Sequence, residues 1–183
     1  DTSTPGRTYL GIHAQGKSPK YTLARVMGLA FQLSTRLKDH EQRDPFHTIV
    51  TYFNSLRELG GAHVIAEDDM PRYLESAFGS EKRRKLIHKI ELTGQVPNDQ
   101  IKNIFRQLED SLLDSEGEES DPLDLVLASN MMSVGVDISR LGLMIVNGQP
   151  KTSAEYIQAT SRIGRKHGSA GLVITLYNWT RPR

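Results

Sequence analysis

Two arginines near the end of the chain have the type and spacing for phosphate chemistry. They lie in the segment S-A-E-Y-I-Q-A-T-S-R-I-G-R, residues 153–165. On a helix, Gln158, Arg162 and Arg165 would be spaced i, i+4 and i+7, with an amide and two guanidinium groups on one face. Two stacked guanidinium groups repel each other unless an anion lies between them, and their planar forks suit phosphate oxygens. The alternative interpretation is a solvated basic edge.

The start of this helix is also encoded in the sequence. Thr152 is followed three positions later by Glu155, which is the spacing of a capping box. The sequence therefore predicts a helix that begins after Thr152 and carries both arginines.

Composition indicates a globular chain. Its 183 residues suffice for one domain with a core, and 37% of them are hydrophobic and 25% charged. The formal net charge is only +1, so overall basicity does not indicate nucleic-acid binding. The chain contains no cysteine, which excludes disulfides and thiolate metal sites and fits a reducing compartment, so we expect a cytoplasmic protein. No apolar run reaches the length of a membrane span, and no signal peptide is recognised.

Charge is unevenly distributed. Residues 107–124 carry eight acidic side chains and no Lys or Arg, whereas residues 151–183 carry six basic side chains against Glu155 alone. The chain begins with Asp rather than Met and ends on Arg-Pro-Arg just after an expected strand. We therefore expect it to be a piece of a longer protein.

The elements that must position the arginines alternate between strands and helices. Apolar runs predict strands at residues 7–13, 46–53, 86–92, 123–128, 141–146 and 171–177. Periodic apolar positions predict helices at residues 19–37 and 97–112, and a further helix begins at Asn54-Ser55 and meets Gly60-Gly61. Residues 62–84 are mostly helical by composition, and the acidic residues 114–121 form a loop.

The last three strands are short, nearly continuous apolar runs, which is typical of strands covered on both faces. Their alternation with helices predicts an α/β fold, with a mostly parallel central sheet between two helical layers. Right-handed crossovers place the loops that follow the strands along one rim. We expect residues 54–55, 93–94, 129–137 and 148–152 to share this rim.

Small polar residues lie on this rim. Ser129 and Asn130 begin a short segment whose N–H groups suit a backbone phosphate, and Thr93-Gly94 and Asn54-Ser55 offer hydroxyls and close backbone approach. When each pair is taken alone, ordinary capping and turn formation explain it better, and only the combination of the pairs favours the phosphate interpretation.

A carboxylate follows one tight turn of this rim. Gly135 and Asp137 stand in G-V-D-I, where Asp137 either caps a loop or accepts a hydrogen bond from a ribose hydroxyl.

Several of these segments resemble motifs of superfamily 2 helicases. S-N-M-M-S-V-G-V-D-I (129–138) is similar to motif V, Q-A-T-S-R-I-G-R (158–165) to motif VI, and I-V-T-Y-F-N-S (49–55) to motif IV. E-L-T-G (91–94) stands where such proteins have a strand ending in a turn that faces nucleic acid. The resemblance covers roughly residues 46–177. One position departs from the commonest pattern of motif VI, in which Gly stands where this chain has Ser161.

The resemblance implies the second RecA-like domain of a helicase, a three-layer sandwich in which residues 1–45 lead into a core of residues 46–177. It implies that Arg162 and Arg165 reach the γ-phosphate of ATP, with Arg165 as the arginine finger, and that Asp137 contacts the ribose. Cofactor-binding residues would be Gln158, Gly135 and Asp137, and residues facing a DNA or RNA backbone would be Asn54, Ser55, Thr93, Gly94, Ser129 and Asn130. ATP would be held mainly by an N-terminal RecA-like domain, which would also bind its Mg²⁺.

A narrower resemblance concerns the exact sequence of motif V and of the strand that follows it. M-M-S-V-G-V-D-I and L-G-L-M-I-V-N-G-Q-P-K are similar to the large helicases of DISARM-type phage defence.

Residues 11–18 spell a P-loop, G-x-x-x-x-G-K-S, between an expected strand and an expected helix. We interpret it as a decoy, because the chain has no later apolar strand ending in Asp-Asp or Asp-Glu to hold magnesium. A self-contained P-loop phosphotransferase fails for the same reason.

Two functions therefore remain open. The first is the C-terminal half of an ATP-dependent helicase or translocase, in which this fragment alone is inactive. The second is a degenerate module that only binds nucleic acid or a protein partner, for which the acidic loop could serve as a docking segment. The histidines have no metal-ligand spacing, so no metal site is predicted.

Overall fold

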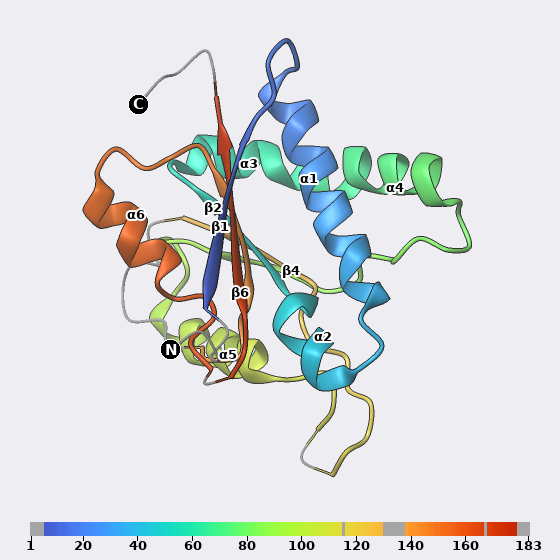
Figure 1. Cartoon of the computed structure of the whole chain (residues 1–183). Coiled ribbons are helices and arrows are strands. Elements are labelled where there is room, and N and C mark those ends of the chain that lie inside the picture. The colour runs from blue at the N-terminus through green and yellow to red at the C-terminus, as the bar shows by residue number, and fades with distance from the viewer. Residues whose placement is uncertain (1–5, 115, 130–137, 167, 179–183) are drawn as a thin grey trace.

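A computed structural model describes residues 6–114, 116–129, 138–166 and 168–178, and its centre is a six-stranded parallel sheet (Figure 1). The strands lie in the order β1-β6-β5-β2-β4-β3, and every neighbouring pair is parallel. Their bounds are β1 Arg7–His13, β2 Ile49–Phe53, β3 Lys89–Leu92, β4 Leu125–Ala128, β5 Leu143–Asn147 and β6 Gly171–Tyr177. The predicted parallel sheet is confirmed.

Helices cover both faces of the sheet and confirm the three-layer prediction. The helical segments are α1 (Pro19–Leu33), η1 (Ser34–Arg36), α2 (His40–His47), α3 (Leu56–Val64), the π-helical turn η2 (Ile65–Asp69), α4 (Met70–Phe78), α5 (Asn98–Glu109) and α6 (Ser153–Thr160). Helices α1, α3 and α4 pack on one face, and α5 and α6 pack on the other.

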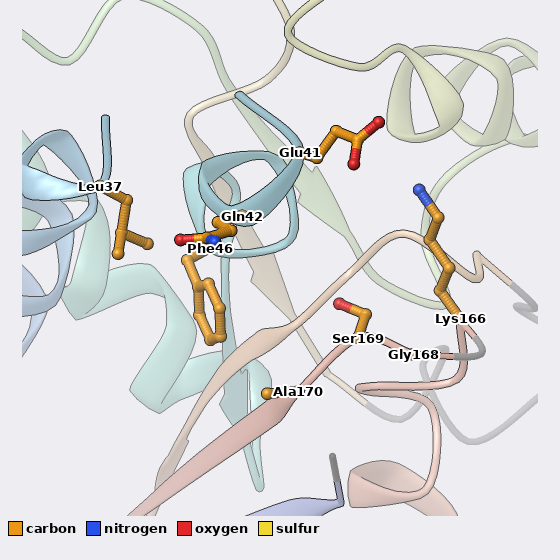
Figure 2. A pocket seen from close by; sticks show the side chains of 8 residues that line it. All are labelled: Leu37, Glu41, Gln42, Phe46, Lys166, Gly168, Ser169 and Ala170. Carbon is orange, nitrogen blue, oxygen red and sulfur yellow. The ribbon is translucent and has the colours of Figure 1, made fainter. Parts of the chain in front are cut away.

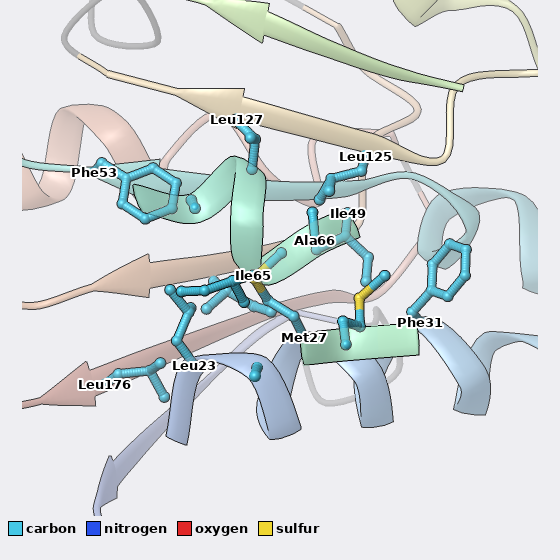
Figure 3. Close-up of a cluster of buried hydrophobic side chains, with 14 of the residues drawn as sticks. Leu23, Met27, Phe31, Ile49, Phe53, Ile65, Ala66, Leu125, Leu127 and Leu176 are labelled. Carbon is cyan, nitrogen blue, oxygen red and sulfur yellow. The ribbon is translucent and has the colours of Figure 1, made fainter. Parts of the chain in front are cut away.

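Alternation along the strands divides the core into two clusters. In β2, Ile49 and Phe53 join Met27 and Phe31 of α1 on one face (Figure 3). Val50 and Tyr52 point to the opposite face, into the cluster that contains residues of α5 and α6. All five residues of β2 are buried, as expected for a central parallel strand covered on both sides.

Helix α2 was not predicted. The sequence analysis assigned Phe46 and His47 to a strand, but both residues end α2, and β2 begins only at Ile49. Asp39 caps the helix by accepting hydrogen bonds from the N–H groups of Glu41 and Gln42. A proline inside the helix conceals it in the sequence, because proline is a strong helix breaker by propensity.

The Gly60-Gly61 pair does not end α3, contrary to the prediction. The chain continues in helical form through α3, η2 and α4, and Gly79, with φ of +83°, follows the last residue. Leu59 and Ala62 on either side of the pair are buried in the core, so tertiary packing outweighs the low helix propensity of glycine.

A buried polar cluster fixes the amino-terminal edge of the sheet. Arg84 donates to Oδ1 of Asp124 at 2.5 Å and to the carbonyl of His47 at 3.0 Å, and its guanidinium lies 3.9 Å from the centroid of Phe31. Burial, together with the charge of Arg84, lowers the pKa of His47 to about 3, so this imidazole is neutral at physiological pH. The cluster holds α2 and the start of β4 together below the sheet.

Candidate functional site

The predicted rim exists at the carboxyl ends of four neighbouring strands. Asn54 follows β2, Thr93 follows β3, Ser129 follows β4 and Gly148 follows β5, and these strands are consecutive in the sheet. Two hydrogen bonds join the loops directly: Ser129 N–H donates to the Leu92 carbonyl at 3.1 Å, and Asn54 Nδ2 donates to the Gly148 carbonyl at 2.7 Å. We call Asn54, Ser55, Thr93, Gly94, Ser129 and Gly148 the carboxyl-edge group.

Asn54 ties two of these loops together. Its amide nitrogen donates to the carbonyls of Asn147 and Gly148, at 3.1 and 2.7 Å. Its Oδ1 is buried and has no hydrogen-bond partner among the described residues. Because both of these hydrogen bonds go to the end of β5 and the loop after it, Asn54 positions that loop.

The hydroxyl groups of the carboxyl-edge group are engaged or buried. Ser55 caps α3 by accepting from the Glu58 N–H, and Thr93 Oγ1 accepts from the Gln95 N–H. Thr93 and Ser129 are 2% and 6% exposed, whereas Gly94 is exposed and a Cβ placed on it would meet no atom within 4 Å. The exposed members of this edge are therefore Ser55 and Gly94, while Thr93 and Ser129 are buried.

Three predicted site residues, Asn130, Gly135 and Asp137, lie outside the described residues.

Helix α6 begins as predicted but ends too early to carry the arginines. Thr152 accepts a hydrogen bond from the Glu155 N–H and caps the helix, and the Glu155 carboxylate accepts from the Tyr52 hydroxyl at 3.1 Å. The helix ends at Thr160, so Arg162 and Arg165 lie beyond it and do not share a helical face with Gln158.

The chain leaves the helix through tight turns and a left-handed glycine. The N–H of Ile163 reaches back three residues to the Thr160 carbonyl, and Gly164 has φ of +63°. We call residues 161–166 the arginine turn. Its conformation replaces the predicted helical stacking of the two guanidinium groups.

Tertiary contacts fix the arginine turn at the amino-terminal edge of the sheet. Gly164 N–H donates to the Leu141 carbonyl at 2.8 Å, and Lys166 N–H donates to the Ser139 carbonyl at 3.1 Å. A Cβ on Gly164 would lie 2.7 Å from Cα of Gly171, the first residue of β6. The turn therefore packs against the segment that follows Asp137 and against the start of β6.

The two arginines differ in their surroundings. Arg162 is half-buried, and its Nε is buried without a hydrogen-bond partner in the described part of the chain. Arg165 and Gln158 are exposed. The structure thus separates the predicted site into the carboxyl-edge group and the arginine turn, with α6 leading from one edge of the sheet to the other (Figure 1).

Two further arginines support this region, and the sequence analysis missed both. Arg140 is buried and donates to the Leu108 carbonyl at 2.9 Å and to Thr48 Oγ1 at 2.7 Å. Burial lowers the pKa of Arg140, and the nearby Asp44 carboxylate, 3.6 Å from Nη1, partly offsets that effect. Arg7 on β1 donates to carbonyls of the arginine turn. Neither arginine belongs to a local motif, so only the fold reveals its contacts.

A pocket of about 430 Å³ lies beside the arginine turn (Figure 2). Lys166 and residues 168–170, which lead into β6, line one side, and residues of α2 line the other. Glu41 and Lys166 place opposite charges across its mouth. The sequence could not indicate this pocket, because α2 was not predicted.

The P-loop spelling does not form a phosphate-binding loop. Gly11 lies inside β1, and Ser18 already caps α1 by accepting from the Tyr21 N–H at 3.2 Å. Only residues 14–17 remain between strand and cap, too few for the loop that the motif requires.

Among the described residues, no group of three or more His, Cys, Asp or Glu side chains is arranged to hold a metal ion. No helix in the same part of the chain combines the length and apolarity that a bilayer span requires.

Comparison with solved structures relates the fold to helicase domains. The chain is similar to the DUF1998 helicase MrfA bound to DNA, with a TM-score of 0.60, 18% identity, and coverage of 94% of this chain and 20% of that one. It is also similar to domain 2 of the DEAD-box helicase Mss116p bound to an RNA duplex, with a TM-score of 0.58, 10% identity, and coverage of 93% and 54%. At these identities the likeness establishes the RecA-like fold.

Comparison of sequences gives a closer relationship. The chain is 44% identical over 186 residues to the DISARM protein DrmA of Bacillus paralicheniformis, an alignment that covers 98% of this chain and 16% of that relative. The narrower resemblance to DISARM helicases is confirmed. Residues 46–167 match the model of the helicase conserved C-terminal domain. The chain therefore belongs to the helicase conserved C-terminal domain family and is a RecA-like domain of the superfamily 2 helicase type.

Proposed function

We propose that this chain is the C-terminal half of the motor of an ATP-dependent helicase or translocase that acts on a nucleic-acid strand. The family match supports this function. Two solved relatives of the same fold are described as bound to nucleic acid, and a second MrfA structure contains AMPPNP, an ATP analogue, together with DNA. The chain spans 16% of the length of DrmA, so the proposal concerns a longer protein.

In this proposal two domains of one protein share the ATP site. An N-terminal RecA-like domain holds ATP and its Mg²⁺, and the present domain closes over the triphosphate. Arg162 and Arg165 stabilise the charge on the transferring phosphoryl group, a contribution of roughly 10³–10⁵ in rate for measured arginine fingers. Gln158, Gly135 and Asp137 complete the nucleotide contacts, with Asp137 on the ribose.

The observation that supports this role most directly is the environment of Arg162. Its Nε is buried and has no hydrogen-bond partner among the described residues, in a turn bound by two main-chain hydrogen bonds to residues 139–141. A buried donor without a partner is costly, and an incoming phosphate oxygen would satisfy it. The same hydrogen bonds bring the turn next to the segment that begins two residues after Asp137.

The carboxyl-edge group supplies the nucleic-acid contacts in this proposal. Asn54, Ser55, Thr93, Gly94, Ser129 and Asn130 follow three neighbouring strands. Because Gly94 is exposed and carries no side chain, we expect the contacts to be with phosphates, with little sequence preference and marked salt dependence. Closing and opening of the two domains would then move the protein along the strand.

The decisive experiment measures ATP turnover of the full-length protein with and without single-stranded DNA or RNA. We expect turnover to rise on addition of the strand and Arg165→Ala to abolish it, while ATP affinity stays within a few-fold. Arg25→Ala is the matched control, since Arg25 is an exposed arginine on α1, on the opposite face of the sheet, where it stacks on Tyr21.

Each negative result has its own meaning. Unchanged turnover in Arg165→Ala would remove the arginine-finger assignment. Strand binding without any ATP turnover in the unaltered protein would favour the alternative, a degenerate helicase-like module that only binds.

A further inference from the structure

Arg7 begins the outermost strand and contacts the arginine turn from outside it. Its Nε donates to the Ile163 carbonyl, and its Nη2 donates to the Ser161 carbonyl at 3.2 Å. These partners lie more than 150 positions later in the sequence. One guanidinium thus joins the edge of the sheet to the end of α6.

The two carbonyls lie on either side of Arg162. The Ser161 carbonyl belongs to the peptide that leads into Arg162, and the Ile163 carbonyl belongs to the second peptide after it. Hydrogen bonds to both restrict the backbone rotations that aim the Arg162 side chain. They also place a positive charge at the carboxyl end of α6, where the helix dipole favours a cation.

Local hydrogen bonds to Ala159 and Thr160 and the buried Ile163 side chain hold the first half of the turn, and among the described residues the long-range main-chain hydrogen bonds of the turn begin at Gly164. Gly164 and Lys166 donate to Leu141 and Ser139, and Gly164 packs on Gly171. These contacts fix the second half of the turn, where Arg165 lies. Arg7 supplies the long-range hydrogen bonds of the first half, around Arg162.

We propose that Arg7 is a positioning residue that holds Arg162 in the orientation needed to meet the triphosphate. This inference rests on the proposed function, and it assigns Arg7 no contact with ATP. Lysine would replace Arg7 poorly, because a single ammonium group cannot span two carbonyls as a planar fork does.

The test compares Arg7→Gln and Arg7→Lys in the full-length protein. We expect strand-stimulated turnover of Arg7→Gln to fall by about tenfold to about a hundredfold, the scale seen when catalytic groups are misplaced by an ångström. Arg7→Lys should recover part of this loss. Affinity for single-stranded DNA should stay within about twofold, because the carboxyl-edge group lies at the other edge of the sheet. Arg25→Gln is the control for removal of a surface guanidinium.

Two readouts separate positioning from general destabilisation. Amide hydrogen exchange should become faster in residues 161–163 of Arg7→Gln, while the amides of β5 and the melting temperature stay unchanged. In an Arg162→Ala background, Arg7→Gln should reduce turnover no further, because the side chain that Arg7 positions is already absent.

The outcomes also distinguish this inference from the proposed function. If Arg162→Ala lowers turnover and Arg7→Gln does not, or if the two losses multiply, the role of Arg7 is refuted and the proposed function stands. If Arg162→Ala leaves turnover intact, the catalytic assignment of Arg162 fails, and the positioning role of Arg7 fails with it.

Discussion

In the carboxyl-edge group, side chains of types suited to binding phosphate make hydrogen bonds within the protein instead. Thr93, Ser55 and Asn54 were predicted to face nucleic acid, and their polar atoms bind neighbouring loops or cap a helix. These contacts organise the edge, and Gly94 on the same edge is exposed and carries no side chain. The nucleic-acid role of these residues remains a prediction.

Replacement of Gly94 by alanine tests that role. A Cβ built on Gly94 meets no atom of the described residues within 4 Å, and the backbone there is not left-handed, so we expect Gly94→Ala to fold normally. A Cβ should keep a phosphate from the main chain and weaken strand binding by about fivefold, the equivalent of one hydrogen bond of about 1 kcal/mol. Fluorescence anisotropy of the full-length protein with a labelled single strand measures this change.

Gly61→Ala is the matched control, because Gly61 is equally exposed but lies in α3. If both variants bind the strand as tightly as the unaltered protein, the turn at Gly94 does not contact the nucleic acid.

At the scale of elements, the arginine turn depends on where α6 ends. The capping box predicted the first residue of α6 correctly, because capping is a local interaction. The end at Thr160 depends on contacts with distant segments, above all the close approach of Gly164 to Gly171. A turn, rather than a helical face, therefore presents the two arginines.

Two glycine variants measure how much this close approach contributes. Gly164 and Gly168 both have positive φ, but a Cβ on Gly168 would meet nothing within 4 Å. Gly168→Ala should therefore cost only the left-handed strain of about 1–2 kcal/mol. Gly164→Ala should cost about 1–3 kcal/mol more, because its Cβ would overlap the main chain of Gly171.

Urea denaturation of the 183-residue chain gives both free energies of unfolding. Equal losses in the two variants would contradict the close packing of the arginine turn on β6.

At the scale of the whole molecule, the domain carries only part of the proposed machinery. Its arginine turn has no phosphate-binding loop beside it in the described residues, and the P-loop spelling is divided between β1 and the cap of α1. The curated relative that the chain matches is far longer, because the alignment covers 16% of it. ATP binding would therefore require the partner domain.

Calorimetry on the isolated 183-residue chain checks this division. We expect no heat of ATP binding at high micromolar ATP, because Arg162 and Arg165 alone would have to hold the triphosphate without a P-loop. Tight binding that is lost in Lys17→Ala would restore residues 11–18 as a nucleotide site and would contradict the two-domain proposal.

The sequence alone determined the fold class, the existence of the six strands though not all of their bounds, the cap of α6 and the helicase motifs. Each of these features depends on residues that are neighbours in the sequence. Apolar runs, turn residues, caps and short sequence motifs are all local signals. The family match agrees with the resemblance drawn from those motifs.

Only the tertiary structure decided where α6 ends, that α2 exists and which atoms of the carboxyl edge stay accessible. It also revealed Arg7 and Arg140, whose hydrogen bonds join segments far apart in the chain. No local sequence pattern indicates such contacts, because they form between segments that only the folded sheet brings together. The direction of the Arg162 side chain is therefore a property of the assembled edge, while its presence is a property of the sequence.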